Sequence, residues 1–199
     1  MPLTAQDPNH QDSSKLSAER QMANSLKLKK IPSPFHNERP NQTIVDLLVI
    51  HNISLPPGQF GTGKVEEFFT GKLNSEEHPF FEEIKDLQVS AHYFIDRTGS
   101  VIEFVDPDQR AWHAGVSSWH GRENCNDFSI GIELEGTDSQ PYSDAQYFSL
   151  TQLVELLMTR YPAISAERIV GHCDIAPTRK TDPGESFDWQ RFRELLSCP

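Results

Sequence analysis

The segment Ile44-Val-Asp-Leu-Leu-Val-Ile-His51 is a nearly continuous run of β-branched and aliphatic residues. Such a run is typical of a β-strand that is buried on both faces. A second segment, Phe128-Ser-Ile-Gly-Ile-Glu-Leu-Glu135, alternates between apolar residues and small or acidic ones. Because successive strand residues point to opposite faces, Glu133 and Glu135 share one face with Gly131. We therefore predict a strand that carries two carboxylates beside a glycine, which leaves room above it.

Helices and a hairpin surround these two predicted strands. The polar segment Arg97–Ser100 lies between two strand-like runs and predicts a hairpin. Ser143-Asp-Ala-Gln146 has the pattern of a capping box, and the apolar stripe that follows predicts a helix ending near Arg160. An amphipathic helix is expected after Asp188. Shorter elements are predicted as helices at Val65–Phe69 and Pro79–Leu87 and as strands at Ser90–Asp96, Val101–Val105 and Arg168–Gly171. Strands mixed with helices indicate an α/β domain around one sheet.

Length and composition favour one globular domain. The chain has 199 residues, of which 36% are hydrophobic and 24% charged, which allows one core and a tail rather than two full domains. Residues 1–23 lack apolar periodicity and are expected to be a flexible N-terminal extension, with the folded domain spanning 24–199. The net charge of −11 opposes the binding of nucleic acid.

Two further features concern the cellular compartment. No run approaches the roughly 20 apolar residues that a membrane-spanning helix needs, and the first 24 residues contain no apolar segment resembling the core of a signal peptide. Three cysteines (Cys125, Cys173 and Cys198) form an odd, sparse set that favours reduced thiols over a disulfide framework. A cytoplasmic protein without membrane association is expected.

Three side chains suggest a metal site. His51 and His172 each end or follow a strand-like run, and ligands in α/β sheets usually bind at strand ends. Asp182 precedes Pro183, which restricts its backbone and so the directions of its carboxylate. Two imidazoles and one carboxylate suit Zn²⁺ with a fourth position left for water. Each histidine alone also suits a hydrogen-bonded structural role, and Asp182-Pro183-Gly184 also suits a turn.

Other charged side chains could act at such a site. Lys180 lies two residues before Asp182, so in an extended segment both would project to the same side, and its ammonium group could stabilise a negatively charged tetrahedral intermediate. Glu133 or Glu135 could act as general base towards water and later protonate the leaving nitrogen. For all three charged groups, simple solvation is the alternative. The segment Trp112–Gly115 suits a groove wall for a sugar or peptide, although a buried tryptophan is the commoner role.

Four segments resemble one protein family, both in their residues and in their order along the chain. They are Val49–Gly58, Ala111–Gly115, Cys125–Gly136 and Gly171–Gly184. Together they resemble the zinc-dependent N-acetylmuramoyl-L-alanine amidases, which are related to phage lysozyme-type amidases and peptidoglycan recognition proteins. Within that family they are most similar to the AmpD-type 1,6-anhydro-N-acetylmuramoyl-L-alanine amidases of cytoplasmic peptidoglycan recycling. The resemblance covers the chain from about Pro32 to the C-terminus.

The resemblance implies a role for each candidate residue. The implied zinc ligands are His51, His172 and Asp182. Glu133, rather than Glu135, is implied as the catalytic carboxylate, and Lys180 takes the oxyanion role. Contacts with substrate are assigned to Asn52, Trp112 and His113.

The implied fold is a central mixed β-sheet flanked by helices. The implied reaction is hydrolysis of the amide bond between the lactyl group of anhydro-muramic acid and L-alanine of the stem peptide. The expected partner is therefore a small molecule, an anhydro-muropeptide, and a monomer is expected.

Three positions depart from the family pattern. Phe80 stands where family members carry a tyrosine, so no phenol hydroxyl is available there, and Gln88 and Asn124 stand where close relatives tend to have arginine. Two alternatives remain open at this point. One is a non-catalytic module that binds peptidoglycan fragments, and the other is an exported wall-lytic amidase with the same chemistry.

Overall fold

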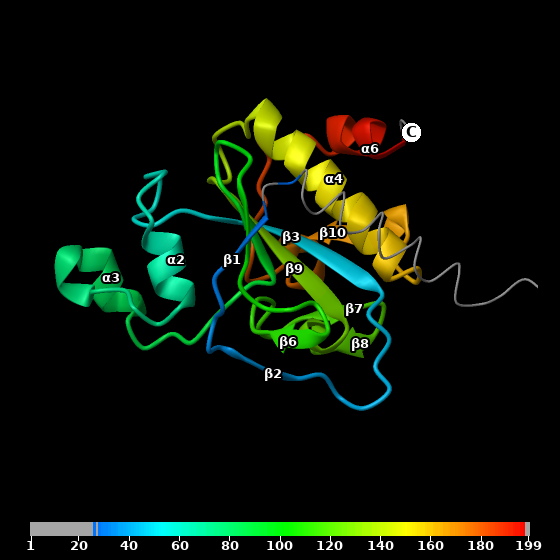
Figure 1. Ribbon diagram of the computed structural model, residues 1–199, viewed down its shortest axis with the longest axis horizontal. Coiled ribbons are helices and arrows are strands. Elements are labelled where there is room, and N and C mark those ends of the chain that lie inside the picture. Colours follow the sequence, from blue (N-terminus) through cyan, green and yellow to red (C-terminus); the bar gives the residue numbers. More distant parts are fainter. Residues whose placement is uncertain (1–25, 27, 198–199) are drawn as a thin grey trace, which may run out of the picture.

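The central sheet is mixed and has six strands among the residues that the computed structural model describes, which are 26 and 28–197. Its order is β1 (Leu28–Lys30), β5 (Val101–Glu103), β4 (Tyr93–Ile95), β9 (Ser129–Glu135), β3 (Leu47–Ile53) and β10 (Ile169–Gly171). Strands β4 and β5 pair antiparallel, and the other neighbours pair parallel. Strands β3 and β9 lie side by side in the middle of the molecule (Figure 1). The predicted α/β fold and the predicted hairpin are confirmed. The predicted extension at 1–23 lies outside the described residues.

Strands β3 and β9 form the centre of the sheet. All seven residues of β3 pair with β9, and His51 lies opposite Glu133. The strand predicted at Ile44–His51 begins later, at Leu47, where pairing with β9 begins, and Ile44 before it is 66% exposed. It also continues past His51 to Ile53, since the pairing with β9 extends to Glu135. His51 therefore projects from within a strand, where pairing with β9 fixes its backbone, one residue beyond the last pair with β10.

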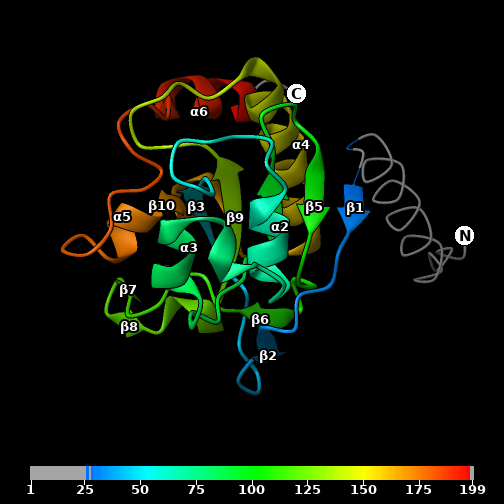
Figure 2. The same ribbon diagram turned by 90° about the vertical axis from the view of Figure 1, so that its left-hand side faces the viewer.

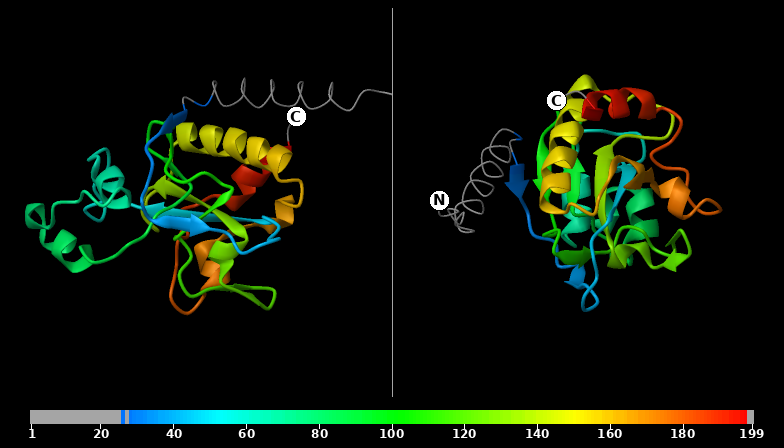
Figure 3. Two further views of the ribbon diagram at one scale, coloured as in Figure 1. Left: turned by 60° about the horizontal axis from the view of Figure 1, so that its bottom comes forward. Right: turned by 90° about the vertical axis from the view of Figure 1, so that its right-hand side faces the viewer.

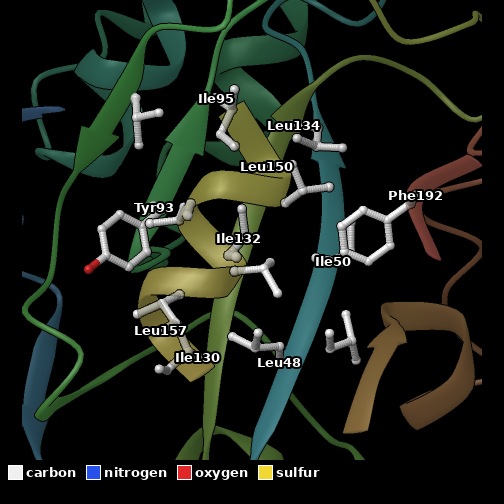
Figure 4. Close-up of a cluster of buried hydrophobic side chains, with 14 of the residues drawn as sticks. Leu48, Ile50, Tyr93, Ile95, Ile130, Ile132, Leu134, Leu150, Leu157 and Phe192 are labelled. Carbon is white, nitrogen blue, oxygen red and sulfur yellow. The ribbon is translucent and has the colours of Figure 1, made fainter. Parts of the chain in front are cut away.

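One face of the sheet carries the main hydrophobic core. Helix α4 (Asp144–Arg160) and helix α6 (Trp189–Ser197) cover this face, and their apolar side chains meet Ile50, Ile132 and other strand residues (Figure 4). The predicted capping box is present, because the Ser143 hydroxyl accepts from the Gln146 amide and the Gln146 side chain accepts from the Ser143 amide. The alternation predicted for this strand is confirmed for Ile130, Ile132 and Leu134, whose side chains lie in the core under α4. It is wrong for Phe128, which precedes β9 in a non-extended conformation and packs with Leu47 and Val49 on the other face.

The opposite face holds two smaller apolar clusters. Helix α2 (Lys64–Phe69) and helix α3 (Pro79–Ile84) lie over one part of it (Figure 2). The helix predicted at Pro79–Leu87 ends at Ile84, and Leu87 is 52% exposed. The short helix α5 (His172–Ile175) follows β10 on this side, away from α4 (Figure 3).

Several short elements have no counterpart in the predictions. They are the edge strand β1, the helix α5, the strand pair β2 (His36–Glu38) and β6 (Gln109–Ala111), the hairpin β7 (Ser118–Trp119) and β8 (Arg122–Glu123), and the 3-10 turns Ser75–Glu77, Cys125–Asp127 and Ala166–Arg168. Segments of two to four residues are too short for periodicity to show. In the described part of the chain, none of the helices has the length and apolar composition needed to cross a bilayer.

Candidate metal centre and its cavity

The candidate metal ligands come together at the carboxyl ends of two adjacent parallel strands. His51 projects from β3, and His172 follows the last residue of β10, which pairs with β3. Asp182 lies on the loop after α5. Its backbone carbonyl accepts a hydrogen bond from the Cys173 amide at 3.0 Å. Parallel strands place their carboxyl ends at one edge of the sheet, so residues far apart in sequence converge there.

Three side-chain atoms form a compact triangle. The Nδ1 atoms of His51 and His172 are 2.9 Å apart, and Asp182 Oδ2 is 3.2 Å from the first and 3.0 Å from the second. Both histidines are buried, and the Asp182 side chain is 13% exposed. The structure thus brings together His51, His172 and Asp182, as the sequence predicted.

The charges of this triangle suit a metal ion. Burial lowers the pKa of His51 to about 4, against the opposing effect of Asp182. Although burial opposes it, contacts with the two imidazoles hold the pKa of the Asp182 carboxyl well below its usual range. Near neutral pH the set therefore offers an ionised carboxylate and a neutral His51, which is the deprotonated state that metal binding requires.

In both histidines the Nε2 atom, which points away from the triangle, has a protein partner, and this leaves the Nδ1 atom without a hydrogen. His172 Nε2 lies 3.1 Å from the Ala114 carbonyl, which can only accept, so this nitrogen carries the hydrogen. His51 Nε2 is likewise turned away, 2.9 Å from His113 Nδ1. The inward atoms are then lone-pair donors that face one another at about hydrogen-bond distance, an arrangement that a cation between them would stabilise. Two imidazole nitrogens and one carboxylate oxygen thus form a set of donor atoms that could hold a metal ion.

Glu133 lies beside the three candidate ligands, and its carboxylate has few hydrogen-bond partners. It is buried, and its Oε2 atom has no hydrogen-bond partner among the described residues. Burial and the charge of Asp182 raise the pKa of its carboxyl well above the usual range, and the positive charge of Lys180 opposes this. A buried carboxyl group with a raised pKa beside a cavity is a candidate for proton transfer.

Glu135 has a different environment, although it lies on the same face of β9. Its Oε1 atom accepts from the Gly61 amide at 2.5 Å, and its Oε2 atom accepts from the Arg97 amide at 3.1 Å. Both carboxylate oxygens are therefore engaged in holding two loops. Of the two carboxylates that the sequence offered as a base, Glu133 is the one that lines the cavity and has a side-chain oxygen, the buried Oε2, without a hydrogen-bond partner among the described residues.

A cavity of about 710 Å³ opens beside the three ligands. Its polar end includes Glu133, Lys180 and Thr181, and its apolar wall lies towards α2 and α3. The wall is formed by Phe68, Phe69, Phe80, Ile84, Leu87 and Trp112. A cavity of this size with one polar and one apolar end is typical of a small-molecule site.

The predicted substrate contacts all line this cavity, but each is also tied to protein groups. Asn52 donates to Asp138 Oδ1 at 2.8 Å, and Trp112 Nε1 donates to Asn37 Oδ1 at 2.6 Å. Both ring nitrogens of His113 have partners, one of them in His51. Asn52 and Trp112 can therefore offer a ligand their remaining atoms and faces.

The positions that depart from the family pattern fall in different places. Phe80 contributes its ring to the apolar wall. Gln88 and Asn124 are not among the described residues that line the cavity, and Gln88 instead lines a separate pocket behind α2. Of the three departures, only the phenylalanine at position 80 therefore changes the lining of the cavity.

Asp138 and Ser129 are two relevant residues that the sequence reasoning missed. The Asp138 carboxylate accepts from Asn52 and, at 2.5 Å, from the Thr181 hydroxyl, so it ties the residue after His51 to the residue before Asp182. No local pattern marks it. Ser129 contacts the His113 ring, and its position on the same face of β9 as Gly131 and Glu133 was an available signal.

Comparisons with known proteins agree with this geometry. Residues 40–185 match the family described as N-acetylmuramoyl-L-alanine amidase. The chain is 57% identical over 164 residues to the 1,6-anhydro-N-acetylmuramyl-L-alanine amidase AmpD of Haemophilus influenzae, covering 82% of this chain and 89% of that protein.

Two solved structures show the same fold. The first is a selenomethionine derivative of AmpD, with 56% identity, a TM-score of 0.84 and coverage of 86% of this chain and 95% of that one. The second is the amidase AmiD from Escherichia coli in complex with the substrate anhydro-N-acetylmuramic acid-L-Ala-D-γ-Glu-L-Lys. It has 30% identity and a TM-score of 0.57, and covers 79% of this chain and 60% of that one.

Proposed function

The chain belongs to the N-acetylmuramoyl-L-alanine amidase family and is an amide hydrolase, and we propose that it uses zinc to cleave anhydro-muropeptides. The bond cleaved is the amide between 1,6-anhydro-N-acetylmuramic acid and L-alanine of the stem peptide, during peptidoglycan recycling. The AmpD relatives, at 54–57% identity, carry this specificity in their names. The AmiD complex holds a ligand of the same chemical class.

The observation that carries the zinc proposal is the triangle of donor atoms from His51, His172 and Asp182. Its three edges are 2.9, 3.2 and 3.0 Å, close to the separations that ligands about 2.0–2.1 Å from one zinc ion would have. When bound, zinc acts as a Lewis acid that polarises a carbonyl oxygen and lowers the pKa of water.

Glu133 is the proposed general base. Its carboxylate lines the cavity and can take a proton from the attacking water and then give that proton to the leaving nitrogen of L-alanine. The water oxygen forms the new bond to the lactyl carbonyl carbon, and the carbon–nitrogen bond breaks. The products are a carboxylic acid on the sugar, which keeps the second water hydrogen until it ionises in solvent, and a peptide with a free amino group.

Lys180 is the proposed stabiliser of negative charge on the carbonyl oxygen. Its side chain lines the cavity, and its positive charge acts on Glu133 and on His51. Cationic groups fixed near a developing oxyanion commonly lower the reaction barrier by about 3–4 kcal/mol. Because Phe80 has no hydroxyl, Lys180 and the metal carry this stabilisation.

Substrate contacts are proposed for the residues between the metal ligands and the apolar wall. Asn52 lies next to His51 on β3, and Trp112 presents its ring to the cavity. His113 also borders the cavity, but with its ring edge only, because both nitrogens bind protein atoms. The polar end suits the scissile amide, and the apolar wall suits an uncharged part of the ligand.

The cytoplasm is the proposed compartment, and a monomer that binds small muropeptides is the proposed form. The described cysteines, Cys125 and Cys173, are both free thiols, which agrees with a reducing environment. A comparison of turnover on soluble anhydro-muropeptides and on intact sacculi tests this. Preference for sacculi would favour an exported, wall-lytic amidase.

The decisive experiment for the function combines activity with metal analysis. The protein is incubated with anhydro-N-acetylmuramoyl-tripeptide, and release of the peptide with a free L-alanine amino group is followed by mass spectrometry. We expect turnover to disappear in metal-free protein and to return with one equivalent of zinc. Full turnover in protein shown by elemental analysis to lack metal would overturn the zinc proposal. Ligand binding without turnover in the zinc-loaded protein would indicate a non-catalytic binding module.

A further inference from the structure

The orientation of His51 depends on a chain of buried hydrogen bonds that begins at a backbone carbonyl. The Ser129 hydroxyl lies 2.6 Å from the Cys125 carbonyl oxygen, which can only accept, so the serine donates its one hydrogen there. The same hydroxyl lies 3.2 Å from His113 Nε2. Because the serine hydrogen is already used, His113 Nε2 must be the donor in this second contact.

The direction of each bond then follows along the chain. A neutral imidazole with its hydrogen on Nε2 has a bare Nδ1, and His113 Nδ1 lies 2.9 Å from His51 Nε2. His51 must therefore donate from Nε2. This leaves His51 Nδ1 without a hydrogen, and it is this atom that lies 2.9 Å from His172 Nδ1 and 3.2 Å from Asp182.

The fold holds the His113 ring firmly in this place. The ring lies directly over Gly131, where an added Cβ atom would be only 2.4 Å from His113 Cγ. The backbone amide of His113 donates to Asn126 Oδ1 at 3.1 Å. His113 and Ser129 are both buried, so bulk water does not compete for these contacts. Packing against Gly131 thus fixes the position of the ring, and its hydrogen bonds fix its partners.

We propose that His113 and Ser129 form a positioning relay for His51, which presents the bare Nδ1 of His51 to the metal. The proposal rests on the metal site proposed above and concerns residues that do not themselves touch the ion. Outer-shell partners of metal-binding histidines fix the hydrogen position and orientation of the ring. Here the relay has two members, and a backbone carbonyl anchors its far end.

The test measures zinc affinity, by competition with a chromogenic chelator, together with kcat and thermal stability of the metal-free protein. Ser129→Ala removes the acceptor of the His113 hydrogen and is expected to weaken zinc binding about 10-fold. Ser149→Ala is the matched control, because Ser149 is also buried and also donates to a backbone carbonyl, that of Gly99, at 2.6 Å. It lies on α4, away from the metal ligands, and should change stability only.

Two substitutions at His113 separate positioning from packing. In His113→Asn an amide oxygen can stand close to the position of Nδ1, whereas in His113→Leu no acceptor remains. We expect His113→Leu to weaken zinc binding by about 10- to 100-fold and His113→Asn to recover part of this loss. A role in packing alone would give losses of stability without this order of zinc affinities.

The outcomes distinguish the relay from the metal site on which it rests. Wild-type protein that binds no zinc would overturn the proposed metal centre. Wild-type protein that binds zinc, together with unchanged affinity in Ser129→Ala and His113→Leu, would overturn the relay alone. If His113→Leu does not fold, Ser129→Ala measured against Ser149→Ala still decides, because equal zinc affinities in these two variants would refute the relay.

Discussion

Replacing Gly131 with alanine should damage the metal centre without touching a ligand. The added Cβ atom would lie 2.4 Å from His113 Cγ and 2.5 Å from His113 Nδ1. Carbon atoms in ordinary contact are about 3.5 Å apart or more, so the ring must move by about 1 Å. The contact between His51 Nε2 and His113 Nδ1, now 2.9 Å, could then lengthen to about 4 Å, beyond hydrogen-bond range.

The size of the effect follows from this displacement. Crowding a packed interior costs about 1–3 kcal/mol of folding free energy, and the lost hydrogen bond should weaken zinc binding by about 10- to 100-fold. The assays are urea unfolding of the metal-free protein and chelator competition for zinc. Gly131 sits in the middle of β9, so the change leaves His51, His172 and Asp182 themselves intact.

Gly99→Ala provides the control for crowding. At Gly99 a Cβ atom would lie 2.7 Å from the Ala145 carbonyl oxygen, and φ is +82°, so stability should also fall. This turn is remote from the relay, and zinc affinity should stay within about twofold of wild type. If Gly131→Ala lost stability but bound zinc like Gly99→Ala, the argument that His113 positions His51 would be wrong.

Three other substitutions test the remaining assignments. Glu133→Gln should lower kcat by about 10²- to 10⁴-fold while the protein still binds zinc; wild-type kcat would move the base elsewhere. Because the pKa of Glu133 is raised in the folded state, the metal-free wild type should lose stability as pH rises from about 4.3 through that raised value, and urea unfolding of Glu133→Gln should show less of this loss. Lys180→Met should lower kcat by about 10²- to 10³-fold, and a change confined to KM would indicate a binding role instead. Glu135→Gln should cost about 1–3 kcal/mol of stability, because Gly61 and Arg97 lose a charged acceptor, with kcat within a few-fold of wild type; a loss as large as that of Glu133→Gln would reverse the two assignments.

The sequence predicted those parts of the fold in which apolar residues recur at the regular spacing of a strand or a helix. The alternation in β9 and the apolar stripe of α4 are long enough for the period to show, and both elements form with bounds close to those predicted. The capping box at Ser143 is a local pattern and was readable for the same reason. Strand β2, with three residues, contains less than two periods of alternation, so nothing in its sequence distinguishes it from a loop.

The candidate site divides in the same way. His51 could be predicted because it lies at the end of a long apolar run, His172 because it follows the short apolar segment Ile169-Val170, and both because the order of the motifs resembled one family. Asp138 could not, because it acts through contacts with Asn52, 86 positions before it, and Thr181, 43 positions after it. Such contacts depend on how two loops approach each other, which no local pattern records. The partnership of His113 with His51, 62 residues apart, is of the same kind.

The hydrophobic core itself specifies the geometry of the site. Ser129, Gly131 and Glu133 follow one another at every second position of β9, and the residues between them, Ile130 and Ile132, are fully buried in the core under α4. A slip of one residue in the pairing of β9 would exchange the two faces. It would place the serine and the carboxylate in that core, at a cost of several kcal/mol, and turn the isoleucines towards the metal ligands. The apolar residues that stabilise the sheet therefore also determine that Ser129, Gly131 and Glu133 lie on the face of β9 that carries the site, the first two against His113 and the third opposite His51.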